Sequence, residues 1–244
     1  MALDRNATKQ ATLYAFDADS PALSARTLYN HQGPARALFD IPQTPDIVEA
    51  LAGYDLLFFS GITLSLYGAA GRARFFDALD RAQARGARIA FDANFRPRGW
   101  PDGPVAHAAY EQAFDRADIV LASTEDLRLL FGGDNPTERL LVYSSAERVL
   151  KLPDLACRIV MADGLDQVVA AKPVARVVDT TAAGDSFAAA YLASRLAGAD
   201  PVTAAEAGHT LAGVVVSHPG AIIPRSAMPG FLQPSDGFFG RTQA

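Results

Sequence analysis

A short segment, Val177–Phe187, combines small residues with one carboxylate in a pattern that could support phosphoryl transfer. Two valines indicate the end of a strand, and the run Thr180-Thr-Ala-Ala-Gly184 leads into a predicted helix. Small side chains there let an anion approach the free backbone N–H groups, where the helix dipole favours negative charge. Asp185 lies in the first turn. A carboxylate beside a phosphate is unfavourable unless it accepts a proton from an attacking hydroxyl.

The same segment also has a purely structural interpretation, which is a capped helix. In that case Thr181 would be the N-cap residue, and the helix dipole would favour Asp185 in the first turn. Residue types and spacing alone favour this simpler interpretation.

Alternating strands and helices surround this segment and must position it. Apolar strands that are buried on both faces and alternate with helices indicate a mainly parallel sheet in an α/β fold. We expect one domain over residues 1–244, with residues 12–32 as a small β lid outside the main sheet. The predicted strands are 12–16, 26–30, 55–60, 87–92, 118–122, 149–152, 157–161 and 167–171, and the predicted helices are 45–53, one around 75–82, 106–117, 125–131, 183–197 and 201–217.

Charge and composition exclude several classes of protein. The 244 residues include 22 Lys and Arg against 27 Asp and Glu, a net charge of −5, which disfavours binding to nucleic acid. Cys157 is the one cysteine, so no intrachain disulfide can form, and a reducing compartment is expected. No apolar run approaches the roughly 18 residues that span a bilayer, and no secretion signal is evident. We expect a soluble, cytoplasmic protein with no membrane partner.

Several ordered motifs resemble one family of kinases. Asp179-Thr-Thr-Ala-Ala-Gly-Asp185 resembles the carboxy-terminal signature of ribokinase-like (phosphofructokinase B-type) carbohydrate kinases. The Thr-Ala-Ala variant is most similar to 2-keto-3-deoxygluconate kinases. The similarity extends from about Leu13 to Pro229, and its other motifs are Phe58-Phe-Ser-Gly-Ile62, Asp92-Ala-Asn-Phe-Arg-Pro-Arg-Gly-Trp100, Tyr191-Leu-Ala193, Gly208-His209 and Gly220-Ala-Ile-Ile-Pro224.

The resemblance implies a ribokinase-like fold and ATP-dependent phosphorylation of a sugar-acid hydroxyl, with Mg2+ as the second cofactor. On that basis Asp185 is the general base. The backbone N–H groups of Ala182, Ala183 and Gly184 would stabilise the charge on the transferred phosphoryl group. Arg96 matches a substrate-binding arginine, and a guanidinium suits a carboxylate or a phosphate.

Other positions match the family with less specific residue types. Each has a structural alternative: strand packing, an exposed lid tyrosine, a helix cap with acids in the first turn, or helix packing. The resemblance implies substrate contacts at Tyr14, Tyr29 and Ile62, ATP contacts at Ser123, Lys151, Gly184, Gly208 and Ala212, and a magnesium-positioning acid at Asp126.

The chain also departs from the family pattern. Its match begins inside the lid region, so the first strand and the sugar-binding Gly-Gly-x-x-x-Asn-type loop have no counterpart. The lid arginine that meets the sugar acid is replaced within Tyr29-Asn-His-Gln32, and a Lys-x-Gly-x-x-Gly-like nucleotide segment is Lys151-Leu-Pro-Asp-Leu-Ala156. Pro153 removes an N–H, and Ala156 adds a side chain where glycine allows close approach.

Two alternatives to an active kinase follow. One is a catalytically impaired or inactive truncated homologue, and the other is an α/β module that senses a phosphorylated metabolite at the helix start. Because a missing first strand would expose a sheet edge, we also expect self-association, most simply as a homodimer.

Overall fold

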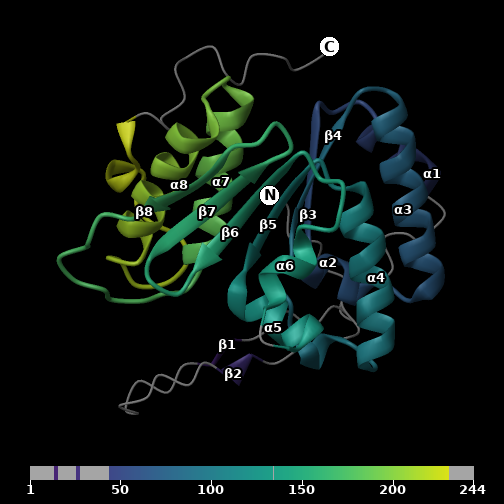
Figure 1. The fold of residues 1–244 in the computed structure, drawn as a ribbon, viewed down its shortest axis with the longest axis horizontal. Helices are drawn as coiled ribbons and strands as arrows, with labels where there is room; N and C mark the ends of the chain where they lie inside the picture. Colours follow the sequence, from purple (N-terminus) through teal and green to yellow (C-terminus); the bar gives the residue numbers. More distant parts are fainter. Residues whose placement is uncertain (1–13, 16–25, 28–43, 134, 231–244) are drawn as a thin grey trace, which may run out of the picture. The chain divides into compact units, whose positions relative to one another are not determined.

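The computed structural model describes residues 14–15, 26–27, 44–133 and 135–230 (Figure 1). It divides into two compact units, residues 1–146 and 147–244, here called the amino-terminal and carboxy-terminal units. Each unit is described by itself. No helix in these described ranges is both long and apolar enough to cross a membrane.

The amino-terminal unit contains a parallel sheet in the order β3-β4-β5. Its strands are largely buried on both faces, as the apolar runs predict, and β4 has no exposed residue. The strands are β3 Leu56–Ser60, β4 Arg88–Asp92 and β5 Ile119–Ser123. The helices are α1 Thr44–Leu51, α2 Gly61–Leu66, α3 Ala69–Ala84, α4 Gly103–Arg116, α5 Thr124–Phe131 and α6 Pro136–Leu140, with a 3-10 turn at Pro97–Gly99.

A pair of very short strands, β1 (Tyr14–Ala15) and β2 (Arg26–Thr27), forms an antiparallel ladder within the predicted lid strands. The rest of those predicted strands lies outside the described residues. Within the described part of the chain, β3 has one neighbouring strand, β4, and its other edge is not paired.

The carboxy-terminal unit is built on two antiparallel hairpins packed against two helices. Strands β6 (Glu147–Leu152), β7 (Ala156–Met161) and β8 (Asp166–Ala170) pair in sequence order. The predicted Asp163-Gly164 turn joins β7 to β8, with Gly164 at a φ of 104°. The two helices, α7 (Ala183–Leu196) and α8 (Pro201–Val215), lie side by side (Figure 1), and a 3-10 turn follows at Arg225–Ala227.

The helix signals in the sequence are confirmed with small shifts. Helix α8 has Pro201 in its first turn, and the Asp200 carboxylate accepts hydrogen bonds from the N–H groups of Val202 and Thr203, both at 3.0 Å. Gly198 follows α7 with a φ of 89°, as a helix-stopping glycine requires. The sequence pattern does not predict α2 and α6, because these helices are too short to show a helical period.

Candidate functional site

Helix α7 begins without a side-chain cap. Ala182 occupies the N-cap position in the left-handed region, at φ 61° and ψ 15°, and no side chain bonds to the helix start. The capped-helix interpretation with Thr181 as N-cap is therefore wrong. The backbone of Thr181 is used in another way, because its N–H donates to Asp179 Oδ1 at 2.8 Å.

The first backbone donors of α7 differ in how far they are occupied. The N–H of Ala183 donates to the carbonyl of Thr180 at 3.2 Å, and that of Ser186 donates to the carbonyl of Ala182 at 2.8 Å. Among the described residues, no acceptor bonds to the N–H of Ala182 or Gly184. These two donors and the helix dipole favour an anion at this place.

Asp179 braces the turn that leads into α7. Its second oxygen accepts the N–H of Gly220 at 2.9 Å, and the N–H of Val178 donates to the carbonyl of Val216 at 2.7 Å. The bonds from Thr181 and then from Gly220 lower the pKa of the Asp179 carboxyl below its usual range. The sequence does not predict this structural role of Asp179, because its partner Gly220 is 41 residues away.

Asp185, the predicted base, lies in the first turn of α7 and is exposed, as expected for a group that must reach a substrate. Among the described residues its carboxylate has no ion-pair partner. A cation lies close to the same turn: a Cβ atom built on Gly184 would lie 3.5 Å from Lys151 Nζ on β6. The structure therefore brings together three predicted site residues, Asp185, Gly184 and Lys151, within one unit.

A hollow of about 530 Å³ lies between α8 and the chain that follows β8. Its size is typical of a small-molecule site. His209 lies in its wall with Nε2 3.0 Å from the Val169 carbonyl oxygen, and burial lowers the pKa of the imidazole. The lining residues are Ala170, Lys172, Pro173, Val174, Ala175, Glu206, His209, Thr210, Gly213, Val214, Ser217 and His218.

Two predicted ATP contacts on α8 lie outside that lining. A Cβ atom on Gly208 would come within 2.8 Å of two ring atoms of Phe187, so α8 approaches α7 closely at this residue. Ala212 is one helical turn further along and partly buried. The sequence contained a signal for the lining of this hollow, because Glu206, Thr210 and Gly213 share one helical face.

In the amino-terminal unit, the predicted substrate arginine and the predicted magnesium acid contact each other. Arg96 Nη1 donates to Asp126 Oδ1 at 3.2 Å and to the carbonyl of Phe95 at 2.9 Å. Asp126 is almost fully buried, while the Arg96 side chain remains about half exposed. Ser123 is the N-cap of α5, and its hydroxyl accepts the N–H of Asp126 at 3.0 Å. The helix-cap alternative for this segment is confirmed for Ser123.

The end of β3 has a strict packing requirement. A Cβ atom on Gly61 would lie 1.7 Å from the hydroxyl oxygen of Tyr110 and 2.2 Å from the carbonyl oxygen of Ala93. The Tyr110 hydroxyl donates to that carbonyl at 2.6 Å, and burial raises its pKa far above the usual range. Ile62, the next residue, is 36% exposed.

The remaining predicted positions are less defined. Tyr14 belongs to β1, where the backbone is placed, and Tyr29 lies outside the described residues. In the described part of the chain, no group of three or more His, Cys, Asp or Glu side chains is placed to hold a metal ion.

Two curated proteins that are similar to this chain over most of its length carry the same enzyme name. The chain is 37% identical over 225 residues to 2-dehydro-3-deoxygluconokinase of Escherichia coli (strain K12), covering 89% of this chain and 72% of the relative. It is 36% identical over 235 residues to the protein of the same name from Dickeya dadantii, covering 93% of this chain and 75% of that one.

Solved structures and a family model agree with these relatives. The structure of aminoimidazole riboside kinase from Salmonella enterica, complexed with aminoimidazole riboside and an ATP analogue, superimposes with a TM-score of 0.62 at 23% identity. This match covers 72% of the present chain but only 60% of the solved one, and it confirms the ribokinase-like α/β fold. The model for pfkB family carbohydrate kinases matches residues 3–228. The chain therefore belongs to the pfkB family of carbohydrate kinases.

Proposed function

We propose that this protein transfers the γ-phosphoryl group of ATP to a hydroxyl of a sugar acid, most specifically converting 2-keto-3-deoxygluconate to its 6-phosphate. The names of the relatives support the substrate class. The observation on which the proposal depends is the start of α7, where the unbonded N–H groups of Ala182 and Gly184, the exposed Asp185 carboxylate and the Lys151 ammonium occur together.

Each group at the start of α7 has a defined role in this reaction. Asp185 accepts the proton from the attacking hydroxyl. The N–H groups of Ala182 and Gly184 stabilise the charge that spreads over the transferred phosphoryl oxygens. Lys151 adds positive charge beside the same turn, which favours the polyphosphate of the nucleotide. Ala183 contributes less than its neighbours, because its N–H already donates to Thr180.

The hollow beside α8 would take the adenine base of ATP. Its wall is partly apolar, with Val174 and Val214, and its imidazole is held mainly neutral by burial, so an uncharged heterocycle is a suitable occupant. Lys172 at the rim and the bonded Thr210 hydroxyl leave polar groups at the edge of the hollow.

Arg96 would bind the carboxylate of the sugar acid, with Asp126 holding the guanidinium in place. Mg2+ is commonly held by substrate phosphates and only one or two carboxylates, so the Asp126 carboxylate would be a suitable protein ligand for the ion. When bound, Mg2+ would neutralise phosphate charge during transfer.

A coupled assay of ADP release, with ATP, Mg2+ and a panel of sugar acids, tests the proposal. We expect turnover with 2-keto-3-deoxygluconate, and a fall in kcat of about 10²–10⁴-fold in Asp185→Asn, the usual contribution of a positioned base. Asp163→Asn is the matched control, because this exposed acid lies in the β7–β8 turn and only caps it, with Oδ1 3.3 Å from the Leu165 N–H.

The possible outcomes separate the alternatives. Unchanged turnover in Asp185→Asn would show that this residue is only a first-turn acid. Binding of ATP or of a phosphorylated sugar acid with no turnover of any substrate would instead indicate the inactive homologue or the metabolite-sensing module.

A further inference from the structure

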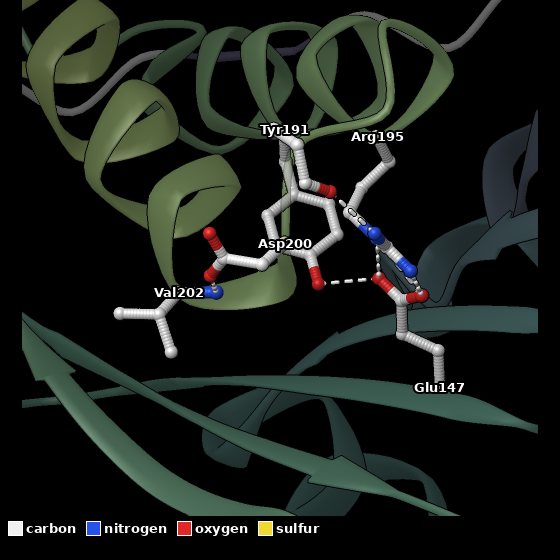
Figure 2. A network of polar contacts seen from close by, with 6 residues as sticks. Glu147, Tyr191, Arg195, Asp200 and Val202 are labelled. Atoms are coloured by element: carbon white, nitrogen blue, oxygen red, sulfur yellow. Dashed lines mark hydrogen bonds and ion pairs between the residues drawn. The ribbon is translucent and has the colours of Figure 1, made fainter.

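A buried charged cluster, distant from the start of α7, links β6 to the second half of that helix. Glu147, the first residue of β6, is 3% exposed. Its carboxylate accepts hydrogen bonds from the Tyr191 hydroxyl and from Arg195, whose Nε and Nη2 atoms lie 2.9 and 2.8 Å from the two oxygens (Figure 2). We call Glu147, Tyr191 and Arg195 the Glu147 clamp.

The clamp also reaches the connection between α7 and α8. Arg195 Nη1 donates to the carbonyl of Ala199 at 2.5 Å. The next residue, Asp200, caps α8 through its bond from the N–H of Val202 (Figure 2). Burial and the Glu147 carboxylate both raise the pKa of the Tyr191 hydroxyl, so it stays protonated and remains a donor. The hydrogen bond to Glu147 raises the pKa of the Arg195 guanidinium, which therefore keeps its charge.

Strand β6 contacts α7 at two points. The distance between the two points along the strand is similar to the distance between their partners along the helix. Glu147 and Lys151 are four residues apart, which is about 13 Å along a strand. Lys151 Nζ lies beside Gly184, and the clamp holds Tyr191 and Arg195, which are about 10 and 16 Å further along the helix axis. The strand and the helix therefore run antiparallel, and fixing the clamp fixes which part of α7 lies opposite Lys151.

We propose that Glu147 is a positioning residue for phosphoryl transfer: it sets the axial position of α7 and so holds Asp185 and the Gly184 N–H in place beside Lys151. This inference rests on the proposed function. A helix that slips by one residue moves by 1.5 Å, and a misplacement of about 1 Å of reacting groups can cost about 10²-fold in rate.

The cluster is better explained by positioning than by stability. A buried ion pair often contributes little net free energy of folding compared with apolar residues of the same size, because both charges lose their hydration. The planar guanidinium of Arg195 nevertheless fixes its position relative to the Glu147 carboxylate, because two parallel hydrogen bonds form only in one relative orientation of the two groups. Aromatic packing already joins the two helices, with the rings of Phe187 and His209 5.0 Å apart.

The test compares Glu147→Gln with Asp166→Asn. The control removes the charge of another bidentate pair, Arg158 Nε and Nη2 to Asp166 at 2.7 and 2.6 Å, which joins β7 to β8 and is partly exposed. Kinetics are measured below the unfolding temperature of each variant. We expect Glu147→Gln to lower kcat by about 10–100-fold with the KM for ATP within about threefold, and Asp166→Asn to leave both unchanged.

A second readout does not depend on activity. Amide hydrogen exchange from Ser186 to Leu192 should be faster in Glu147→Gln and unchanged in Asp166→Asn, because the clamp holds this part of α7. Arg195→Lys keeps the charge but loses the bidentate pair, so it should show a smaller change in both kcat and hydrogen exchange. This variant replaces Glu147→Gln in the test if Glu147→Gln does not fold.

The outcomes distinguish the two proposals. A wild-type protein that phosphorylates no sugar acid overturns the proposed function. Unchanged exchange in α7, or faster exchange with kcat unchanged, overturns the positioning role of Glu147. A lower unfolding temperature with unaltered kcat would show that the clamp is structural only.

Discussion

Replacing Gly208 with alanine tests whether this residue packs the two helices or lines the nucleotide site. The new Cβ atom would lie 2.8 Å from two ring carbons of Phe187 and 3.0 Å from its carbonyl oxygen. The ring is buried and in contact with Tyr191 and His209, and the carbonyl belongs to the backbone of α7, so neither can move freely.

The control on the same helix is Gly213→Ala. Its Cβ atom would lie 3.1 Å from one methyl carbon of Val174, an atom in the wall of the hollow. Both substitutions gain about 1 kcal/mol of helix propensity, so this contribution cancels when the two variants are compared. Overpacking at Gly208 costs about 1–3 kcal/mol, and we expect Gly208→Ala to be less stable than Gly213→Ala by about that amount.

Thermal unfolding and ATP titration should distinguish the two variants, because one is expected to change stability and the other ATP affinity. For a chain of this size, a difference of 1 kcal/mol shifts Tm by about 2–4 °C. Gly208→Ala should therefore have a lower Tm than Gly213→Ala and leave ATP affinity unchanged, while Gly213→Ala should weaken ATP binding by narrowing the hollow. If Gly208→Ala weakens ATP binding without a loss of stability, Gly208 contacts the nucleotide as the family resemblance implies, and the packing argument is refuted.

Three further predictions concern the nucleotide segment, the brace before α7 and the free edge of β3. Pro153→Gly combined with Ala156→Gly should strengthen ATP binding in isothermal titration, because it restores a backbone donor and removes a methyl group; equal affinities would place this turn away from the nucleotide. The Asp179 pKa lies below 3.8 in the folded state, so its contribution to the free energy of unfolding is complete above that pH and is lost as the pH falls through the lower folded value. Asp179→Ala should therefore flatten the acid side of the stability curve, and an unaltered curve would contradict the brace. Light scattering after size exclusion should show a dimer, since β3 pairs on one side only in the described chain and its Phe58 is 50% exposed; a monodisperse monomer would count against this prediction.

The sequence by itself determined most of the elements and the identity of the central segment. Helix α4 begins at Gly103, three residues before its predicted start at residue 106, because apolar periodicity is a local signal that locates a helix but not its exact first residue. The ordered motif from Asp179 to Asp185 indicated the family before any contact was known, and the comparisons confirm the family. The roles assigned to individual residues within that motif stay predictions.

Tertiary structure decided which groups meet. The left-handed Ala182 replaces the expected cap at Thr181, because Asp179 uses the Thr181 N–H together with that of Gly220. The bond from the Gly220 N–H to Asp179 cannot be predicted from the sequence near Asp179, because the two residues are 41 positions apart.

The Glu147 clamp shows the same limit. Glu147 and Arg195 are 48 residues apart, and as single residues in the sequence they look like an ordinary strand acid and a surface cation. Only the packing of α7 on β6 buries the Glu147 carboxylate, and a buried charge requires a partner such as the largely covered Arg195.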